Sequence, residues 1–326
     1  MDRLKVLVVG CGSIGKRHAR LLNERDDVEL WVCDALRENV EAALREAPGA
    51  GAFADYSEAL AAGAQVVFIC TPNHLHRPMC EQAFAAGCEV FCEKPLADTA
   101  ENARAMARAA GEAGRLLQVG YVLRMYPAMR RLREMAEDGY LGNLVGGRAL
   151  AGSYFTLMCA TTPYRMTEKN ALIVDYTHQL DYMRMFFGDL ESVFAHSATL
   201  GDLPMKPEPN MFDISLRYQS GALVQVHLDY VQHPQRHFIE LFGDRRVAQY
   251  DFETTELRVW DRQEKGYHAE FMLTIRDEVF KEHHEVFLQA VRQGGEATIT
   301  AEDGVAALVA AEACVKSAEV GEMVKV

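Results

Sequence analysis

The chain has 326 residues, of which 49% are hydrophobic and 25% are charged, proportions that exclude disordered, collagen-like and disulfide-scaffold proteins. With roughly 150 residues in an ordinary domain, the length predicts two domains. The formal net charge of −13 disfavours binding to nucleic-acid phosphates or to anionic membranes.

The first 122 residues alternate short β-branched runs with alanine-rich helical stretches, a pattern typical of βαβ units and a parallel sheet. We expect strands at residues 4–9, 28–33, 65–71, 89–93 and 116–122. We expect helices at residues 14–23, 36–46, 76–86 and 99–114.

From residue 123 the pattern changes. After a helix at 127–137, alternating runs joined by turns predict a mostly antiparallel sheet. Further helices are expected at 175–187, 276–292 and 302–318. The sequence therefore predicts an α/β protein with one domain at 1–122 and another at 123–326, whose closing helix could pack back on the first.

A glycine-rich turn follows the first predicted strand. Gly10, Gly12 and Gly15 have the GxGxxG spacing where the next helix begins. In a dinucleotide site the first glycine permits the turn, the second lets the backbone approach a pyrophosphate, and the third lets helix and strand pack closely. We expect the turn, including Ser13 and Ile14, to bind the phosphates.

An acidic residue ends the second predicted strand. Asp34 lies 19 residues beyond Gly15, where its carboxylate would accept hydrogen bonds from the adenosine ribose. This position predicts NAD rather than NADP. Arg37 leaves dual specificity open, since its guanidinium could reach a 2′-phosphate if Asp34 turned away.

Two more polar segments end predicted strands, at the sheet edge where ligands of open α/β sheets bind. The first runs from Thr71 through Pro72 and Asn73 to His76, and Asn73 could hydrogen-bond a cofactor. The second is Glu93-Lys94-Pro95. A simple turn and a solvated lysine are the structural alternatives.

The helix expected at 175–187 carries a candidate acid–base pair. Asp175, His178 and Tyr182 would share one helical face, so Asp175 could orient His178 as a general base. Helix capping by Asp175 is the structural alternative.

Four segments, in this order and spacing, carry a resemblance to a known family: residues 10–15, 71–76, Glu93-Lys94-Pro95 and 120–127. Together they resemble the glucose-fructose oxidoreductase and inositol dehydrogenase family, Gfo/Idh/MocA. The resemblance implies an N-terminal Rossmann domain, a C-terminal α/β domain with an open sheet, and hydride transfer between nicotinamide and a carbohydrate-like hydroxyl or ketone.

The resemblance also implies residue roles. Lys94 and His178 would be catalytic, with Asp175 orienting His178. The cofactor would contact the glycine turn, Asp34, the 71–76 segment and Glu93-Lys94, and the substrate would contact Lys94, Asp175 and His178. Further expected contacts are Arg124 for both ligands and Tyr154 and Arg165 for the substrate. Residues 168–174 replace a glycine run found in many relatives, which leaves the substrate open.

These features predict an NAD-dependent dehydrogenase or ketoreductase of a sugar, sugar acid, cyclitol or nucleotide-linked sugar. Two alternatives remain: a dinucleotide-sensing regulator, and a glycoside-cleaving enzyme that uses NAD transiently. The joint presence of Lys94 and His178 argues against the regulator.

Partners and location follow from weaker patterns. The alternating strands beyond residue 211 predict a homodimer or homotetramer joined through the second sheet. We expect no metal site, and we expect His283-His284 on the solvated face of a helix. Eight cysteines without a CxxC pair, and the lack of a signal-like N-terminus, predict reduced thiols and a cytoplasmic protein.

Overall fold

The computed structural model describes residues 3–159 and 164–326. The chain divides into two compact units, one made of Met1–Met125 with Ile275–Leu308 and the other of Tyr126–Thr274 with Val309–Val326. Within the described residues, no helix combines the length and apolar character needed to cross a membrane.

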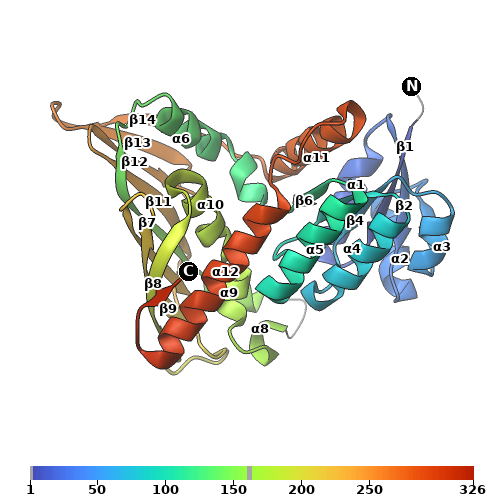
Figure 1. Ribbon diagram of the computed structural model, residues 1–326, viewed down its shortest axis with the longest axis horizontal. Helices are drawn as coiled ribbons and strands as arrows, with labels where there is room; N and C mark the ends of the chain where they lie inside the picture. Colours follow the sequence, from blue (N-terminus) through green and yellow to red (C-terminus); the bar gives the residue numbers. More distant parts are fainter. Residues whose placement is uncertain (1–2, 160–163) are drawn as a thin grey trace. The chain divides into compact units, whose positions relative to one another are not determined.

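The first unit is built on a six-stranded parallel sheet in the order β3-β2-β1-β4-β5-β6 (Figure 1). Its strands are β1 (Leu4–Val9), β2 (Val28–Cys33), β3 (Gly51–Phe53), β4 (Val66–Ile69), β5 (Glu89–Cys92) and β6 (Leu117–Val119). Its helices are α1 (Ser13–Asn23), α2 (Arg37–Glu46), α3 (Tyr56–Ala61), α4 (His76–Ala85), α5 (Ala100–Ala113) and α11 (Arg276–Gln293), with short 3₁₀ turns η1 (Asn73–Leu75) and η2 (Val122–Met125).

The central strands are buried on both faces. Val6, Leu7 and Val8 of β1 are fully buried, as are all residues of β4. This accounts for their continuous apolar runs, because a parallel sheet covered by helices needs apolar residues on both sides. The ends of these strands, where the chain turns into a helix, are where the candidate site begins.

The second unit is built on a nine-stranded sheet in the order β14-β13-β12-β11-β7-β10-β9-β8-β15. All pairs are antiparallel except β7 with β10. Its strands are β7 (Leu144–Gly152), β8 (Leu190–Ala198), β9 (Met211–Tyr218), β10 (Leu223–Asp229), β11 (Arg236–Gly243), β12 (Arg246–Asp251), β13 (Glu256–Asp261), β14 (His268–Phe271) and β15 (Val324–Lys325). Its helices are α6 (Pro127–Glu137), α7 (Phe155–Met158), α8 (Tyr164–Thr167), α9 (Ala171–Asp175) and α10 (Thr177–Phe187); α12 (Ala301–Val320) begins in the first unit and ends in the second.

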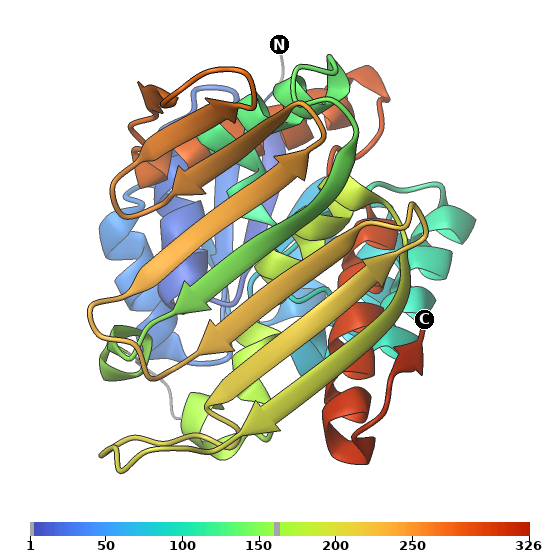
Figure 2. The same cartoon turned by 90° about the vertical axis from the view of Figure 1, so that its left-hand side faces the viewer.

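One face of this sheet lies open. Figure 2 shows the strands face on, and none of the described helices lies over the side turned to the viewer. In β9 and β10, Phe212, Ile214, Val224 and Val226 point to the buried face, while residues between them are mostly exposed. The alternating pattern therefore serves the unit's own core, and the open face carries mainly polar side chains.

The predicted fold class is confirmed, with local differences in several elements. The short β3 and α3 were not expected. The predicted strand 116–122 ends at Val119, and the predicted helix 175–187 is interrupted at Tyr176. Residues 275–308 group with the first unit, because α11 packs against α1.

Candidate functional site

The glycine turn in the first unit has no room for side chains at two of its three glycines. Gly10 has φ +87°, and a Cβ there would lie 2.7 Å from the Cys70 carbonyl. A Cβ on Gly15 would lie 1.8 Å from the Gly10 carbonyl oxygen. Gly10 and Gly15 are therefore required by the packing of β1, α1 and the end of β4.

Gly12 differs, because a Cβ there would meet nothing within 4 Å. Gly12 is also the N-cap of α1, and no side chain caps this helix end. An uncapped helix N-terminus beside open space offers backbone N–H groups to an anion. The turn thus fits a dinucleotide pyrophosphate. The residues at this helix start are Gly12, Ser13 and Ile14.

Asp34 is held against the same turn. Its Oδ2 accepts a hydrogen bond from the Cys11 N–H at 2.7 Å, and its Oδ1 accepts one from the Leu36 N–H at 2.8 Å. These bonds fix the carboxylate where a ribose-binding acid is expected. Arg37 is exposed and pairs with Glu41, one helical turn further along.

His76 joins the two other strand-end segments. The ring is 1% exposed, and its Nε2 lies 2.8 Å from the Thr71 carbonyl while its Nδ1 lies 3.1 Å from the Pro95 carbonyl. Burial lowers the pKa of His76 despite these carbonyl partners. A cofactor contact by His76 stays a prediction. In the structure, the ring links the backbone at Thr71 to the backbone at Pro95.

Glu93 directly follows β5 and is buried, whereas the Lys94 side chain is half-buried. Glu93 Oε1 lies 2.9 Å from Nε2 of His18, and Glu93 Oε2 accepts the Lys94 backbone N–H at 3.1 Å. Burial alone would raise the pKa of Glu93, but the hydrogen bond to His18, the Lys94 charge and the Lys94 backbone N–H lower it overall. The carboxylate is therefore ionised beside Lys94.

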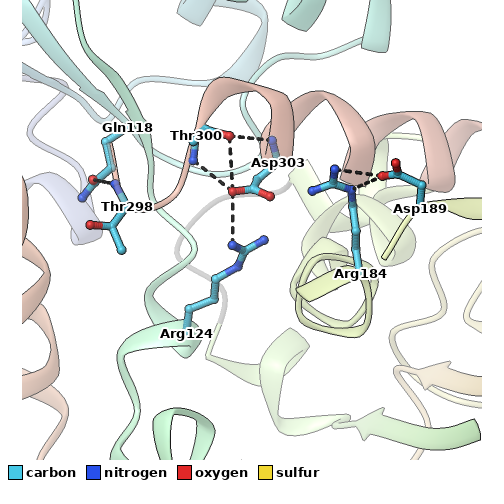
Figure 3. Close-up of polar contacts among 7 residues, drawn as sticks. All are labelled: Gln118, Arg124, Arg184, Asp189, Thr298, Thr300 and Asp303. Atoms are coloured by element: carbon cyan, nitrogen blue, oxygen red, sulfur yellow. Dashed lines mark hydrogen bonds and ion pairs between the residues drawn. The ribbon is translucent and has the colours of Figure 1, made fainter. Parts of the chain in front are cut away.

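Arg124 is largely buried and pairs with Asp303. Its Nη1 lies 3.1 Å from Asp303 Oδ2, and the same carboxylate oxygen accepts the Thr300 N–H where α12 begins. Figure 3 shows the guanidinium directed at this carboxylate. The structure thus gives Arg124 a partner at a helix start, and its predicted ligand contacts remain predictions.

In the second unit, Asp175 belongs to α9 rather than to the helix that carries His178. Tyr176, with φ −98° and ψ 27°, separates α9 from α10, so the expected single helical face is wrong. His178 and Tyr182 lie one turn apart on α10 and so share a helical face, with Tyr182 fully buried and His178 half-buried.

Asp175 instead lies in a cluster of polar side chains. It accepts hydrogen bonds from Arg165 Nε and, at 2.5 Å, from the Tyr230 hydroxyl. Tyr154 is another predicted substrate contact, and its hydroxyl accepts the Met205 backbone N–H at 3.2 Å. The two donors to Asp175 are Arg165 and Tyr230. Two strong donors hold this carboxylate in place, which suits a group that binds hydroxyls or supports a base.

Sequence analysis missed one polar group of the first unit. His284 was expected on a solvated face, but both His283 and His284 are fully buried. His284 lies 2.7 Å from His18, which sequence analysis did not single out. The available signal was the position of His18, three residues after Gly15 on the buried face of α1.

Within the described residues, no group of three or more His, Cys, Asp or Glu side chains is arranged to hold a metal ion.

Comparison with protein families matches both units. Residues 4–121 match the GFO_IDH_MocA oxidoreductase family, described as having an NAD-binding Rossmann fold, and residues 129–249 match the GFO/IDH/MocA C-terminal domain. Among solved structures, an Agrobacterium radiobacter oxidoreductase in complex with NAD⁺, L-tartaric acid and magnesium has a TM-score of 0.90 at 22% identity, covering 99% of this chain and 98% of that one. A levoglucosan dehydrogenase in complex with NADH and L-sorbose has a TM-score of 0.88 at 22% identity, covering 100% and 99%.

Curated relatives cover most of the chain. The inositol 2-dehydrogenase of Rhizobium meliloti (strain 1021) is 27% identical over 95% of each protein. The 1,5-anhydro-D-fructose reductase of Ensifer adhaerens is 30% identical over 80% of this chain and 79% of its own length. The chain therefore belongs to the GFO/IDH/MocA oxidoreductase family.

Proposed function

We propose that this protein is an NAD-dependent oxidoreductase that transfers a hydride between nicotinamide and a hydroxyl or keto carbon of a sugar, sugar acid or cyclitol. The observation that carries the proposal is the Gly10–Gly15 turn with Asp34 bonded to it, in a chain whose relatives act on inositol and anhydrofructose. A nucleotide-linked sugar is a further substrate class consistent with this chemistry.

The residue roles are part of this proposal. Gly12, Ser13 and Ile14 would hold the pyrophosphate, and Asp34 the adenosine ribose. When bound, NAD accepts or returns the hydride.

Lys94 would polarise or protonate the reacting oxygen, and His178 would exchange its proton. Asp175 would orient His178. Arg165 and Tyr230, which donate to the Asp175 carboxylate, would hold it in place for this role.

The direct test is a substrate panel. The purified protein is mixed with NAD and separately with inositols, aldoses, anhydrosugars and sugar acids, and NADH is followed by its absorbance. We expect NADH formation with at least one cyclic polyol or sugar, and mass spectrometry of the purified protein identifies any retained dinucleotide. Lack of NADH formation across the panel, and of NADH consumption with the matching ketones, would contradict the proposal.

Asp34 should set the choice of cofactor. A 2′-phosphate would face a fixed carboxylate, so we expect tighter binding of NAD(H) than of NADP(H). Replacement Asp34→Ala also frees the Cys11 and Leu36 N–H groups, so affinity for both cofactors should fall. The ratio of the Kd for NADP(H) to the Kd for NAD(H) should fall by about tenfold or more, or roughly 1.4 kcal/mol.

Fluorescence titration with both cofactors measures this preference, and Glu112→Ala, which removes an exposed carboxylate of α5, serves as a control. A wild-type protein that prefers NADP(H) would refute the assignment of Asp34.

The alternating apolar residues of β9 and β10 serve the unit's own core, so assembly as a homodimer or homotetramer rests on the uncovered face of the second sheet alone. The free cysteines, seven of them buried, suit the reducing cytoplasm that we propose as its location. On the open face, Leu223 is 62% exposed, so Leu223→Arg should weaken the assembly, whereas Leu36→Arg, at a site that is 54% exposed in the first unit, should not. Light scattering at micromolar concentration measures the mass; a wild-type monomer would count against this proposal.

A further inference from the structure

A chain of three buried polar side chains leads to Lys94 from the interior of the first unit. His284 on α11 lies 2.7 Å from His18 on α1, through Nε2 and Nδ1 respectively. The other ring nitrogen of His18 lies 2.9 Å from Glu93 Oε1. We call His284, His18 and Glu93 the buried relay.

The chemistry of these groups sets the direction of the hydrogen bonds. An ionised carboxylate only accepts, so His18 Nε2 donates to Glu93. Nδ1 of a neutral His18 must then accept a hydrogen bond from His284 Nε2. This leaves His284 Nδ1 unprotonated, and that atom has no hydrogen-bond partner among the described residues. Burial lowers the pKa of His284 well below its usual value, which keeps that ring neutral.

The surroundings of the relay are apolar. The His18 ring lies 5.4–5.5 Å from the rings of Phe68, Phe91 and Phe280. Placing a carboxylate and two imidazoles in such a core costs free energy, and apolar side chains of similar volume often stabilise a core at least as well. Stability by itself therefore gives little reason for the relay.

The Glu93 carboxylate also has little freedom to move. A Cβ on Gly120 would lie 2.9 Å from the Glu93 carboxyl carbon, so the missing side chain at this glycine makes room for the carboxylate. On the other side, Glu93 Oε2 accepts the backbone N–H of Lys94 at 3.1 Å. The relay thus fixes a carboxylate directly against the backbone of Lys94.

We propose that the buried relay is a positioning network for Lys94, in which His284 orients His18, His18 holds the Glu93 carboxylate, and Glu93 fixes the backbone and charge environment of Lys94. This inference rests on the proposed function for the role of Lys94 in turnover. His18, Glu93 and His284 are positioning residues and would not contact the substrate.

The test uses four variants of the full-length protein. Glu93→Gln removes the charge but keeps the shape, and His18→Leu removes the link between His284 and Glu93. His18→Gln is the conservative rescue, because one amide can donate to Glu93 and accept from His284. His283→Leu is the matched control: His283 is equally buried, lies 4.8 Å from the Phe91 ring, and has no hydrogen-bond partner among the described residues.

The first readout does not depend on any substrate. Lys94 is acetylated in competition with the exposed Lys265 by a reactive ester, and both rates are measured by peptide mass spectrometry. His18 holds the Glu93 carboxylate, and Glu93 in turn holds the Lys94 backbone, so Glu93→Gln and His18→Leu should loosen Lys94 and raise its relative rate by about 3- to 10-fold. His18→Gln and His283→Leu should stay near the wild-type rate.

The second readout is steady-state kinetics with an active compound from the panel. Glu93→Gln and His18→Leu should lower kcat about tenfold and leave the Kd for NAD within about twofold, since positioning affects the reacting group more than the dinucleotide. If the panel yields no activity, the proposed function fails while the labelling rates still decide on the relay.

Two results would overturn the inference. One is a folded Glu93→Gln protein whose Lys94 is labelled at the wild-type rate. The other is an equal effect of His283→Leu and His18→Leu, which would show that only core packing matters. Should His18→Leu fail to fold by circular dichroism, the comparison of Glu93→Gln with His18→Gln decides.

Discussion

Replacing Lys94 or His178 by alanine is expected to lower turnover by about 10²- to 10⁴-fold, or roughly 3 to 5 kcal/mol. The reason is that a group acting on the reacting oxygen interacts with charge that develops only during hydride transfer. The dinucleotide would be held mainly by the glycine turn and Asp34, so NAD affinity should change no more than several-fold. Single-turnover NADH formation, together with fluorescence titration of NAD, separates the two effects.

The double variant should lose less than the product of the two single losses, because two groups on one proton path do not act independently. Lys265→Ala and His268→Ala are matched controls at exposed positions and should retain wild-type turnover. Near-normal turnover in folded Lys94→Ala and His178→Ala proteins would refute the proposed roles. The protein would then be better explained as a dinucleotide-binding regulator.

The second large effect expected is a steep loss of stability in mild acid. Burial lowers the pKa of four histidines, to about 3 for His237 and His283 and in direction also for His76 and His284. In the unfolded chain each has a pKa near 6.5. Below about pH 6.5 the unfolded state therefore binds protons that the folded state does not, and unfolding becomes easier as the pH falls.

The size of the effect follows from the number of protons. Each of these groups lowers the free energy of unfolding by at most about 1.4 kcal/mol per pH unit, so the four together lower it by at most about 5 kcal/mol per unit. The free energy of unfolding, roughly 5–15 kcal/mol for an ordinary domain, should therefore fall steadily as the pH drops below 6.5. Urea unfolding followed by circular dichroism at several pH values between 7 and 4.5 measures the slope.

His283→Leu should reduce this slope by up to about 1.4 kcal/mol per pH unit, because it removes one of the four groups. His227 should act in the opposite sense. Hydrogen bonds to Asp229 and Asp213 raise the pKa of His227 to about 9, so its contribution is present below pH 6.5 and is lost as the pH rises towards 9. A stability that does not change between pH 7 and 5 would contradict this explanation.

Local patterns predicted the first unit well. β1 and β2 begin and end where expected, because their apolar runs are covered on both faces and end at Gly10 and Asp34. The glycine turn was predictable because its requirements are steric and local. By contrast, β3 has only three residues, and Gly51 packs against the Trp31 ring, a tertiary contact that no local pattern reveals.

Tertiary contacts also explain what sequence analysis missed around the candidate site. The break at Tyr176 separates Asp175 from α10, and Asp175 meets Tyr230, 55 residues further along the chain. His18 and His284 are 266 residues apart and meet only because α11 packs on α1. The amphipathic pattern of α11 indicated a helix, but it did not show that both histidines lie on its buried side.

Deuterium transfer tests the central claim most directly. The most active panel compound, deuterated at its carbon-bound positions, is incubated with NAD and the protein, and the product and dinucleotide are examined by mass spectrometry. We expect one deuterium in the reduced nicotinamide for each molecule of ketone formed. Deuterium that returns to a cleaved sugar product without net NADH, or the absence of any transfer, would contradict an enzyme that oxidises a hydroxyl with NAD.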